Sequence, residues 1–163
     1  MSIKDKFTDQ EWEELVQAPM LAGMAVTAAD PGGLWAAIKE GSGMARTLAE
    51  AKSNPDPDSL PSVISATLEN AEGRRVTQQN LIELVKGRKP AELSAFAVER
   101  LGEIDALIAA KAPEHVGTYR ELVRTTARNV AEAAKEGGFL GIGGEQISDA
   151  EKKTLDDIDR ALS

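Results

Sequence analysis

A chain of 163 residues suits one compact domain, and a hydrophobic share of 42% is ordinary for a globular protein. The chain has no cysteine, which excludes disulfides, thiolate metal sites and a cysteine nucleophile, and which is compatible with a reducing cytosol. Its formal net charge of −8 argues against nucleic-acid binding, because a polyanion is repelled at long range, and favours cations or basic partners.

No segment near the start predicts export or membrane insertion. Residues Met1–Phe7 are charged and lack the apolar region of a signal peptide. The stretch poorest in charge, Ala18–Ala29, is too short for a membrane span. We therefore expect a cytoplasmic protein with no transmembrane segment. Because aromatic residues make up only 4% of the chain, its core should consist mainly of aliphatic side chains.

The first helix has a clear start signal. Thr8 and Glu11 have the spacing of a capping box, and Phe7 and Trp12 have that of a hydrophobic staple. Apolar residues then recur at helical intervals as far as Met24. These patterns predict a helix that begins just after Thr8.

Two prolines punctuate the next part of the chain. Pro19 should kink or split the first helix near Gln17–Ala18, because it lacks a backbone N–H. The Asp-Pro-Gly-Gly sequence at Asp30–Gly33 predicts a turn. A second helix is expected from about Leu34 to Ala51, followed by the polar loop Ser53–Asp58.

Five more helices follow in the prediction. Their expected ranges are Ser59 to Gly73, Thr77 to Lys86, Pro90 to Lys111, a helix that opens at Pro113, and a last helix from Ser148 to the chain end. Gly87 should end the helix expected from Thr77 to Lys86. Ser148 and Glu151 form a second capping-box pattern. The short link at Pro113 predicts that the helices on either side of it are antiparallel neighbours.

The resulting fold prediction is an all-α, single-domain bundle of about seven helices that spans residues 1–163. No stretch alternates apolar and polar residues for long enough to predict a strand. Residues Met20–Leu48 and Val123–Leu162 both read as helix, turn, helix, which suggests two pseudo-symmetric helical hairpins.

The glycine-rich segment Gly137–Gly144 is the least ordinary part of the sequence. No strand precedes it and no Gly-Lys-Ser/Thr follows, so it lacks the fingerprints of a nucleotide-binding loop. Two interpretations remain for its apolar residues Phe139, Leu140 and Ile142. They can pack onto the core, or they can form an exposed docking point for a partner or a membrane surface.

Acidic residues at the ends of the two hairpins form a candidate cation site. Asp30 and Glu136 occupy equivalent turn positions, and Glu145, Asp149 and Glu151 follow the glycine-rich segment. Carboxylate oxygens suit a hard cation such as Ca²⁺ or Mg²⁺, although the spacing is not that of an EF-hand. Alternatively, Asp149 and Glu151 simply favour the positive end of the last helix.

The basic residues and the lone histidine indicate no enzyme. Arg74–Arg75 and the cluster of Lys86, Arg88 and Lys89 could meet an acidic partner or phosphate, but we interpret them as complements to the C-terminal ends of helices. His115 is expected at the surface, and no Ser/His/acid arrangement is recognisable.

Two stretches of the chain resemble the tellurite-resistance TerB-like helical proteins. They are Met20–Gly32, with its Ala-Asp-Pro-Gly turn, and Ala131–Gly137, which leads to the Ser-x-x-Glu start at Ser148–Glu151. The chain departs from the family pattern at Pro31 and at Lys135, and no Ser-x-x-Glu follows the first turn. The resemblance implies metal binding by acidic turn residues, here Asp30, Glu136 and Glu151, and a role in stress responses or membrane-associated complexes.

The end of the chain, Gly138–Leu162, also resembles a recurrent ending of small bacterial proteins of unassigned function. We therefore expect a non-enzymatic helical protein that acts through protein–protein interaction, with divalent-cation binding as the implied addition. One alternative is a ligand-free scaffolding bundle that self-associates. Another is a small-molecule binder or enzyme with an interhelical pocket, for which Tyr119 and Thr126 are the polar candidates on the helix stripes.

Overall fold

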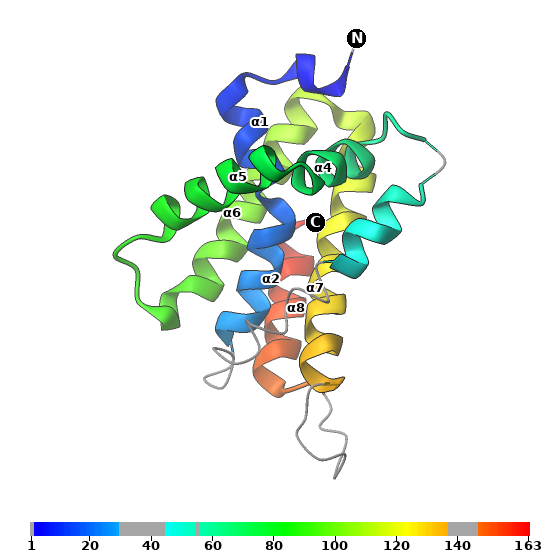
Figure 1. Ribbon diagram of the computed structural model, residues 1–163. Helices are drawn as coiled ribbons and strands as arrows, with labels where there is room; N and C mark the ends of the chain where they lie inside the picture. Colours follow the sequence, from blue (N-terminus) through cyan, green and yellow to red (C-terminus); the bar gives the residue numbers. More distant parts are fainter. Residues whose placement is uncertain (1, 30–44, 55, 137–146) are drawn as a thin grey trace.

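Helices make up most of the chain that the computed structural model describes, which is residues 2–29, 45–54, 56–136 and 147–163 (Figure 1). The helices are α1 (Asp9–Val16), α2 (Ala18–Ala29), α4 (Leu60–Glu69), α5 (Ala71–Val85), α6 (Pro90–Lys111), α7 (Val116–Glu136) and α8 (Asp149–Ala161). Residues 45–52 are also helical, and two 3₁₀ turns cover Ile3–Lys6 and Pro113–His115. Within these ranges there is no strand, so the all-α prediction is confirmed.

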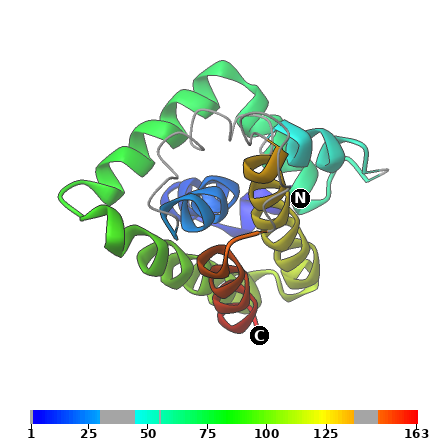
Figure 2. The same cartoon turned by 90° about the horizontal axis from the view of Figure 1, so that it is seen from below.

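Helix α2 is the centre of the bundle. It packs against α6, α7 and α8, which surround it in the view along its axis (Figure 2). Its sequence is apolar on every side, and a helix of that kind has to be buried all round. Small residues such as Ala22, Gly23 and Ala25 are buried, which lets its neighbours approach closely. The charge-poor stretch of the sequence is thus the core helix, and no described helix is long and apolar enough to cross a membrane.

The two capping boxes are confirmed. Thr8 Oγ1 accepts the backbone N–H of Glu11 at 3.2 Å, and Glu11 Oε2 accepts that of Thr8 at 2.7 Å. The Phe7 and Trp12 rings lie 6.4 Å apart between centroids, as a hydrophobic staple requires. The predicted break near Gln17 is also present, because α1 ends at Val16 and α2, which contains Pro19, starts at Ala18.

The boundary between α4 and α5 differs from the prediction. Helix α5 begins at Ala71, six residues before the expected Thr77 cap, and α4 ends at Glu69. The side chain of Asn70 caps α5 by accepting the backbone N–H groups of Glu72 and Gly73 at 3.0 and 3.1 Å. Gly73 does not end a helix; it lies in the first turn of α5, where Asn70 accepts its backbone N–H. The predicted stop at Gly87 is confirmed by its φ of +77°.

Helices α6 and α7 form an antiparallel hairpin through the 3₁₀ turn at Pro113–His115. The range of α6 agrees with the prediction, and its buried residues Ala97, Leu101, Ile104 and Ile108 recur at helical spacing on one side. Among the described residues, the largest fully buried side chains are aliphatic apart from Tyr119. The low aromatic content of the chain therefore did predict the kind of core it builds.

Part of the predicted organisation lies outside the described residues. The turn at Asp30–Gly33 and the first part of the helix expected from Leu34 to Ala51 fall there, although residues 45–52 are helical. The glycine-rich segment Gly137–Gly144 falls there too. The two pseudo-symmetric hairpins therefore stay a prediction.

Candidate functional site

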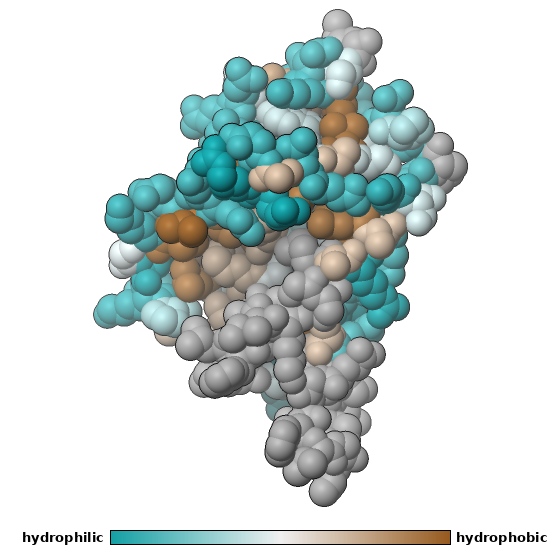
Figure 3. Space-filling model, in the orientation of Figure 1, coloured by the Kyte–Doolittle hydropathy of each residue, from teal (hydrophilic) through white to brown (hydrophobic). Residues whose placement is uncertain are grey.

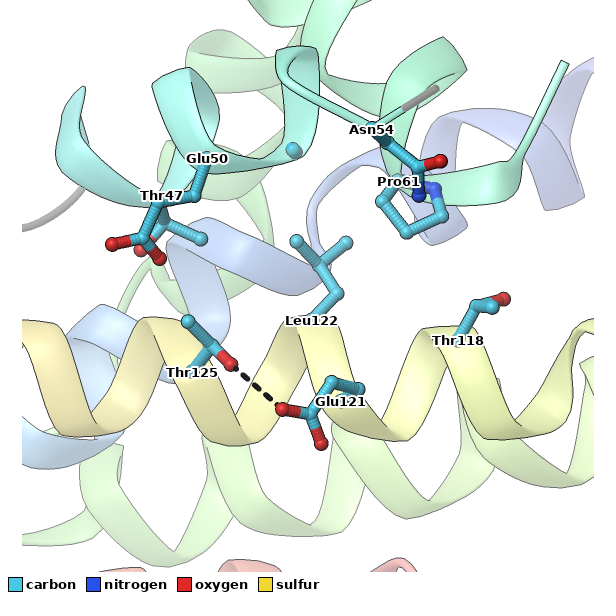
Figure 4. A pocket seen from close by; sticks show the side chains of 9 residues that line it. Thr47, Glu50, Asn54, Pro61, Thr118, Glu121, Leu122 and Thr125 are labelled. Carbon is cyan, nitrogen blue, oxygen red and sulfur yellow. Dashed lines mark hydrogen bonds between the residues drawn. The ribbon is translucent and has the colours of Figure 1, made fainter. Parts of the chain in front are cut away.

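An open cleft of about 220 Å³ lies between the helical residues 45–52, the start of α4 and the middle of α7 (Figure 4). Its lining residues come from two parts of the sequence that are far apart, residues 47–61 and residues 118–125. They are Thr47, Glu50, Ala51, Asn54, Pro61, Thr118, Glu121, Leu122 and Thr125.

One wall of the cleft is a single face of α7. Thr118, Glu121, Leu122 and Thr125 are spaced at i, i+3, i+4 and i+7, so their side chains follow one side of the helix. Leu122 is 5% exposed and belongs to the core. Together with Pro61 it gives the cleft an apolar floor, whereas the threonine and glutamate side chains supply polar walls (Figure 4).

The opposite wall is attached to α7 by a buried amide. Asn129 is 8% exposed, and its Nδ2 donates to Thr47 Oγ1 at 3.1 Å and to Glu50 Oε2 at 3.4 Å. The other carboxylate oxygen of Glu50 accepts Arg46 Nε at 3.2 Å. Because Asn129 lies one turn beyond Thr125 on α7, it fixes the helical residues 45–52 against that face and positions Glu50 at the cleft.

A second carboxylate lies across the cleft from Glu50. Glu121 Oε1 accepts the hydroxyl of Thr125 at 3.3 Å, which orients it along the α7 face (Figure 4). None of the described lining residues carries a positive charge. The surface of the cleft is therefore mainly apolar, with two carboxylates and several hydroxyl and amide groups around it.

The residues predicted as a cation site or as a docking loop are mostly outside the described part of the chain. This is so for Asp30, Phe139, Leu140 and Ile142. The backbone of Glu136 ends α7, but its side chain also falls outside. Within the described residues, no group of three or more histidines and carboxylates is placed to hold a metal ion. Metal binding by this set stays a prediction.

Glu151 has the helix-capping role that was its alternative interpretation. Its Oε2 accepts the backbone N–H of Ser148 at 2.8 Å, and Ser148 Oγ accepts the N–H of Glu151 at 3.2 Å. The residue is only 8% exposed. Its carboxylate is therefore engaged at the first turn of α8.

The basic residues agree in part with their predicted role at helix ends. Arg74 Nη1 donates to the Leu68 carbonyl in the last turn of α4 at 3.4 Å. Arg88 instead lies over the Phe96 ring, 3.6 Å from its centroid. His115 is half-buried in the 3₁₀ turn, where its Nε2 is 3.6 Å from Glu114 Oε1.

Tyr119 and Thr126, the polar candidates for an interhelical pocket, do not line the cleft. The Tyr119 hydroxyl donates to the Leu101 carbonyl at 2.8 Å, and the Thr126 hydroxyl donates to the Leu122 carbonyl at 2.7 Å. Both residues are completely buried. Burial raises the pKa of Tyr119 far above its ordinary value, and the nearby charge of Asp105 adds to this rise in pKa. These two groups therefore satisfy core hydrogen bonds.

Sequence reasoning missed the cleft. A polar stripe at Thr118, Glu121 and Thr125 was visible, but such a stripe is typical of any solvent-facing helix side. The approach of residues 45–52 to this stripe depends on packing between distant segments. Comparison with protein-family models, with curated proteins and with solved structures finds no match for this chain. The resemblance to TerB-like proteins stays a prediction.

Proposed function

We propose that this protein binds a small organic cation, of the alkylamine or diamine class, in the cleft between residues 45–52 and α7. The observation that supports the proposal is the composition of the lining. Glu50 and Glu121 contribute carboxylates on two walls, and no lining residue among the described residues is cationic. Glu50 is paired with Arg46 from outside the lining. In the part of the chain that the structure describes, Glu121 accepts only the Thr125 hydroxyl, so a bound ammonium group would supply the charge that Glu121 lacks.

The apolar floor favours an organic ligand over a bare metal ion. Divalent cations such as Ca²⁺ prefer six to eight oxygen ligands, whereas an alkylammonium uses a few acceptors and buries its carbon chain. Leu122 and Pro61 offer surface for that chain. The volume of about 220 Å³ is below that of drug-sized sites, which are roughly 300–1,000 Å³, so the ligand should be small.

The net charge of the whole protein also favours a cationic ligand. The net charge of −8 attracts cations toward the surface of the protein. Glu50 also meets Arg46, so a ligand has to share that carboxylate or use Glu121. Because exposed ion pairs contribute only about 0.2–1 kcal/mol each, we expect modest affinity that weakens as salt is added.

A titration of ¹⁵N-labelled protein with 1,5-diaminopentane and with butylamine tests this proposal. We expect the amide signals of Thr118, Leu122 and Thr125 to shift and saturate. Butan-1-ol should produce much smaller shifts, because it has the carbon chain without the charge. Equal shifts with the alcohol, or shifts confined to other helices, would contradict the proposal.

Charge-removing variants identify the carboxylates involved. Glu121→Gln should weaken diamine binding roughly two- to fivefold, as the loss of one exposed ion pair implies. Glu132→Gln is a matched control, because it removes the same charge from the same helix outside the cleft lining. If both variants weaken binding equally, the effect is one of net charge and the cleft is not the site.

A further inference from the structure

The turn between α5 and α6 forms the left-hand edge of the molecule in two perpendicular views (Figures 1 and 2). We define the α5–α6 corner as Ile82, Val85, Lys86, Arg88, Lys89 and Phe96. Gly87, with its φ of +77°, ends α5 and reverses the chain, and Pro90 starts α6 three residues later. The corner lies away from α7 and therefore from the cleft.

Apolar side chains at this corner are incompletely buried. Ile82 is 63% exposed, which makes it the most exposed large hydrophobic residue in the described part of the chain. Val85, one turn later on a neighbouring face of α5, is half-buried, as is Phe96 on α6. The surface view shows hydrophobic residues near this edge among hydrophilic ones (Figure 3). Ile82 is thus the apolar side chain of the corner that is mainly exposed.

The charge of this region is opposite to that of the whole protein. Residues 82–92, around the turn, contain three lysines and arginines and two glutamates, a net charge of +1, whereas the chain carries −8. One of these glutamates is already paired, Glu83 with Lys86 at 3.4 Å. Arg88 and Lys89 remain as cationic groups at the turn.

The remaining cations are presented outward from the turn. The guanidinium of Arg88 lies over the Phe96 ring at 3.6 Å, a contact that leaves its N–H groups free of any carboxylate within the described residues. Glu92, the nearest carboxylate on α6, is held by the backbone N–H of Lys89 at 3.2 Å. The corner thus offers cationic groups beside an exposed apolar side chain.

We propose that the α5–α6 corner docks an acidic amphipathic segment of a partner protein. Ile82 is the apolar anchor, and Lys86, Arg88 and Lys89 bind carboxylates that flank the apolar face of the partner. Charge complementarity identifies the class of partner, because a segment of net positive charge on an acidic protein selects an acidic surface. Recognition of an amphipathic helix by apolar and charged groups together is a common mode of peptide binding.

A probe peptide tests this docking directly. The probe is a 14-residue peptide with leucine at helical spacing and glutamate at the other positions, and its control carries lysine in place of glutamate. In protein labelled at isoleucine δ1 methyl groups, the Ile82 signal should shift and saturate with the acidic peptide only. An unmoved Ile82 signal, or equal shifts with both peptides, would overturn the proposal.

Surface variants separate docking from non-specific charge effects. Ile82→Gln and Arg88→Gln should each weaken binding of the acidic peptide at least fivefold. Arg128→Gln removes one exposed positive charge on α7 and should leave binding unchanged. Two results would overturn the proposal. Tighter binding to phosphatidylserine vesicles than to the peptide would assign the corner to a membrane. Micromolar self-association that is lost in Ile82→Gln would assign it to a second copy of the chain.

Discussion

Arg120 and Asp105 form a two-pronged ion pair that joins α7 to α6. Arg120 Nε donates to Asp105 Oδ1 and Arg120 Nη2 donates to Asp105 Oδ2, both at 2.8 Å. The Asp105 side chain is only 9% exposed, so solvent screens the pair less than the other ion pairs of the surface. The hydrogen bonds that Arg120 donates to Asp105 also raise the pKa of Arg120, which stays charged.

Breaking this pair should destabilise the hairpin. We expect Asp105→Asn to reduce the free energy of unfolding by about 1.5–3 kcal/mol, because it removes the charge that satisfies a partly buried guanidinium. Urea denaturation followed by circular dichroism measures the loss. Glu99→Gln, at an exposed position of the same helix, should change the free energy of unfolding by less than about 0.5 kcal/mol. Similar values for the two variants would show that the pair contributes little.

Tyr119 should make stability depend on pH at alkaline values. Its pKa is raised in the folded protein, first by burial and second by the charge of Asp105, above the ordinary tyrosine pKa of about 10 that applies in the unfolded chain. The stabilisation from this group is therefore fully present below about pH 10 and is lost as the pH rises beyond that value. Tyr119→Phe should reduce the decline of the urea midpoint between pH 9 and pH 11.

The titration of Tyr119 can be observed without ambiguity, since it is the only tyrosine of the chain. Ultraviolet absorbance of the phenolate should stay low in the folded protein at pH 10.5 and should increase when urea unfolds it. A phenolate signal that develops near pH 10 while circular dichroism is unchanged would contradict the buried hydrogen bond to Leu101.

Two glycines in helices should respond in opposite ways to alanine. A Cβ at Gly73 would lie 2.3 Å from the Thr67 carbonyl oxygen, so the backbone has to move, and we expect a loss of about 1–3 kcal/mol. At Gly117 a Cβ would meet nothing within 4 Å, and helix propensity predicts a gain of about 0.5–1 kcal/mol. Thermal melts of the two variants measure the loss of stability at Gly73 and the gain at Gly117. A gain at Gly73 would show that α4 and α5 are less closely packed there.

The predicted cation site has a separate test. If Asp30 and Glu136 bind Ca²⁺ or Mg²⁺, as the resemblance to TerB-like proteins implies, a hundredfold excess over the dissociation constant should stabilise the fold by about 2.7 kcal/mol. Asp30→Asn or Glu136→Gln should abolish the rise in Tm. Glu151→Gln keeps a side chain that can cap α8, so it tests the third carboxylate without removing the cap. An unchanged Tm with every ion would remove the metal prediction.

Local patterns in the sequence predicted most helix boundaries because the contacts that set them are local. The capping box of Thr8 and Glu11 joins residues three positions apart, and Pro19 acts on the backbone next to it. The boundary at Asn70 was missed although its signal is also local. An asparagine followed by a glycine in the first turn can be read either as a helix end or as a cap.

The sequence by itself therefore determined the fold class, the aliphatic core and most of the helix starts that lie within the described residues, through interactions within three or four residues. Only the tertiary structure decided that α2 occupies the centre and that a cleft forms beside α7. The hydrogen bond from Asn129 to Thr47, which holds that cleft together, joins residues 82 positions apart. Helical periodicity specifies which face of each helix is apolar, but the pairing of distant faces depends on the packing of the whole chain.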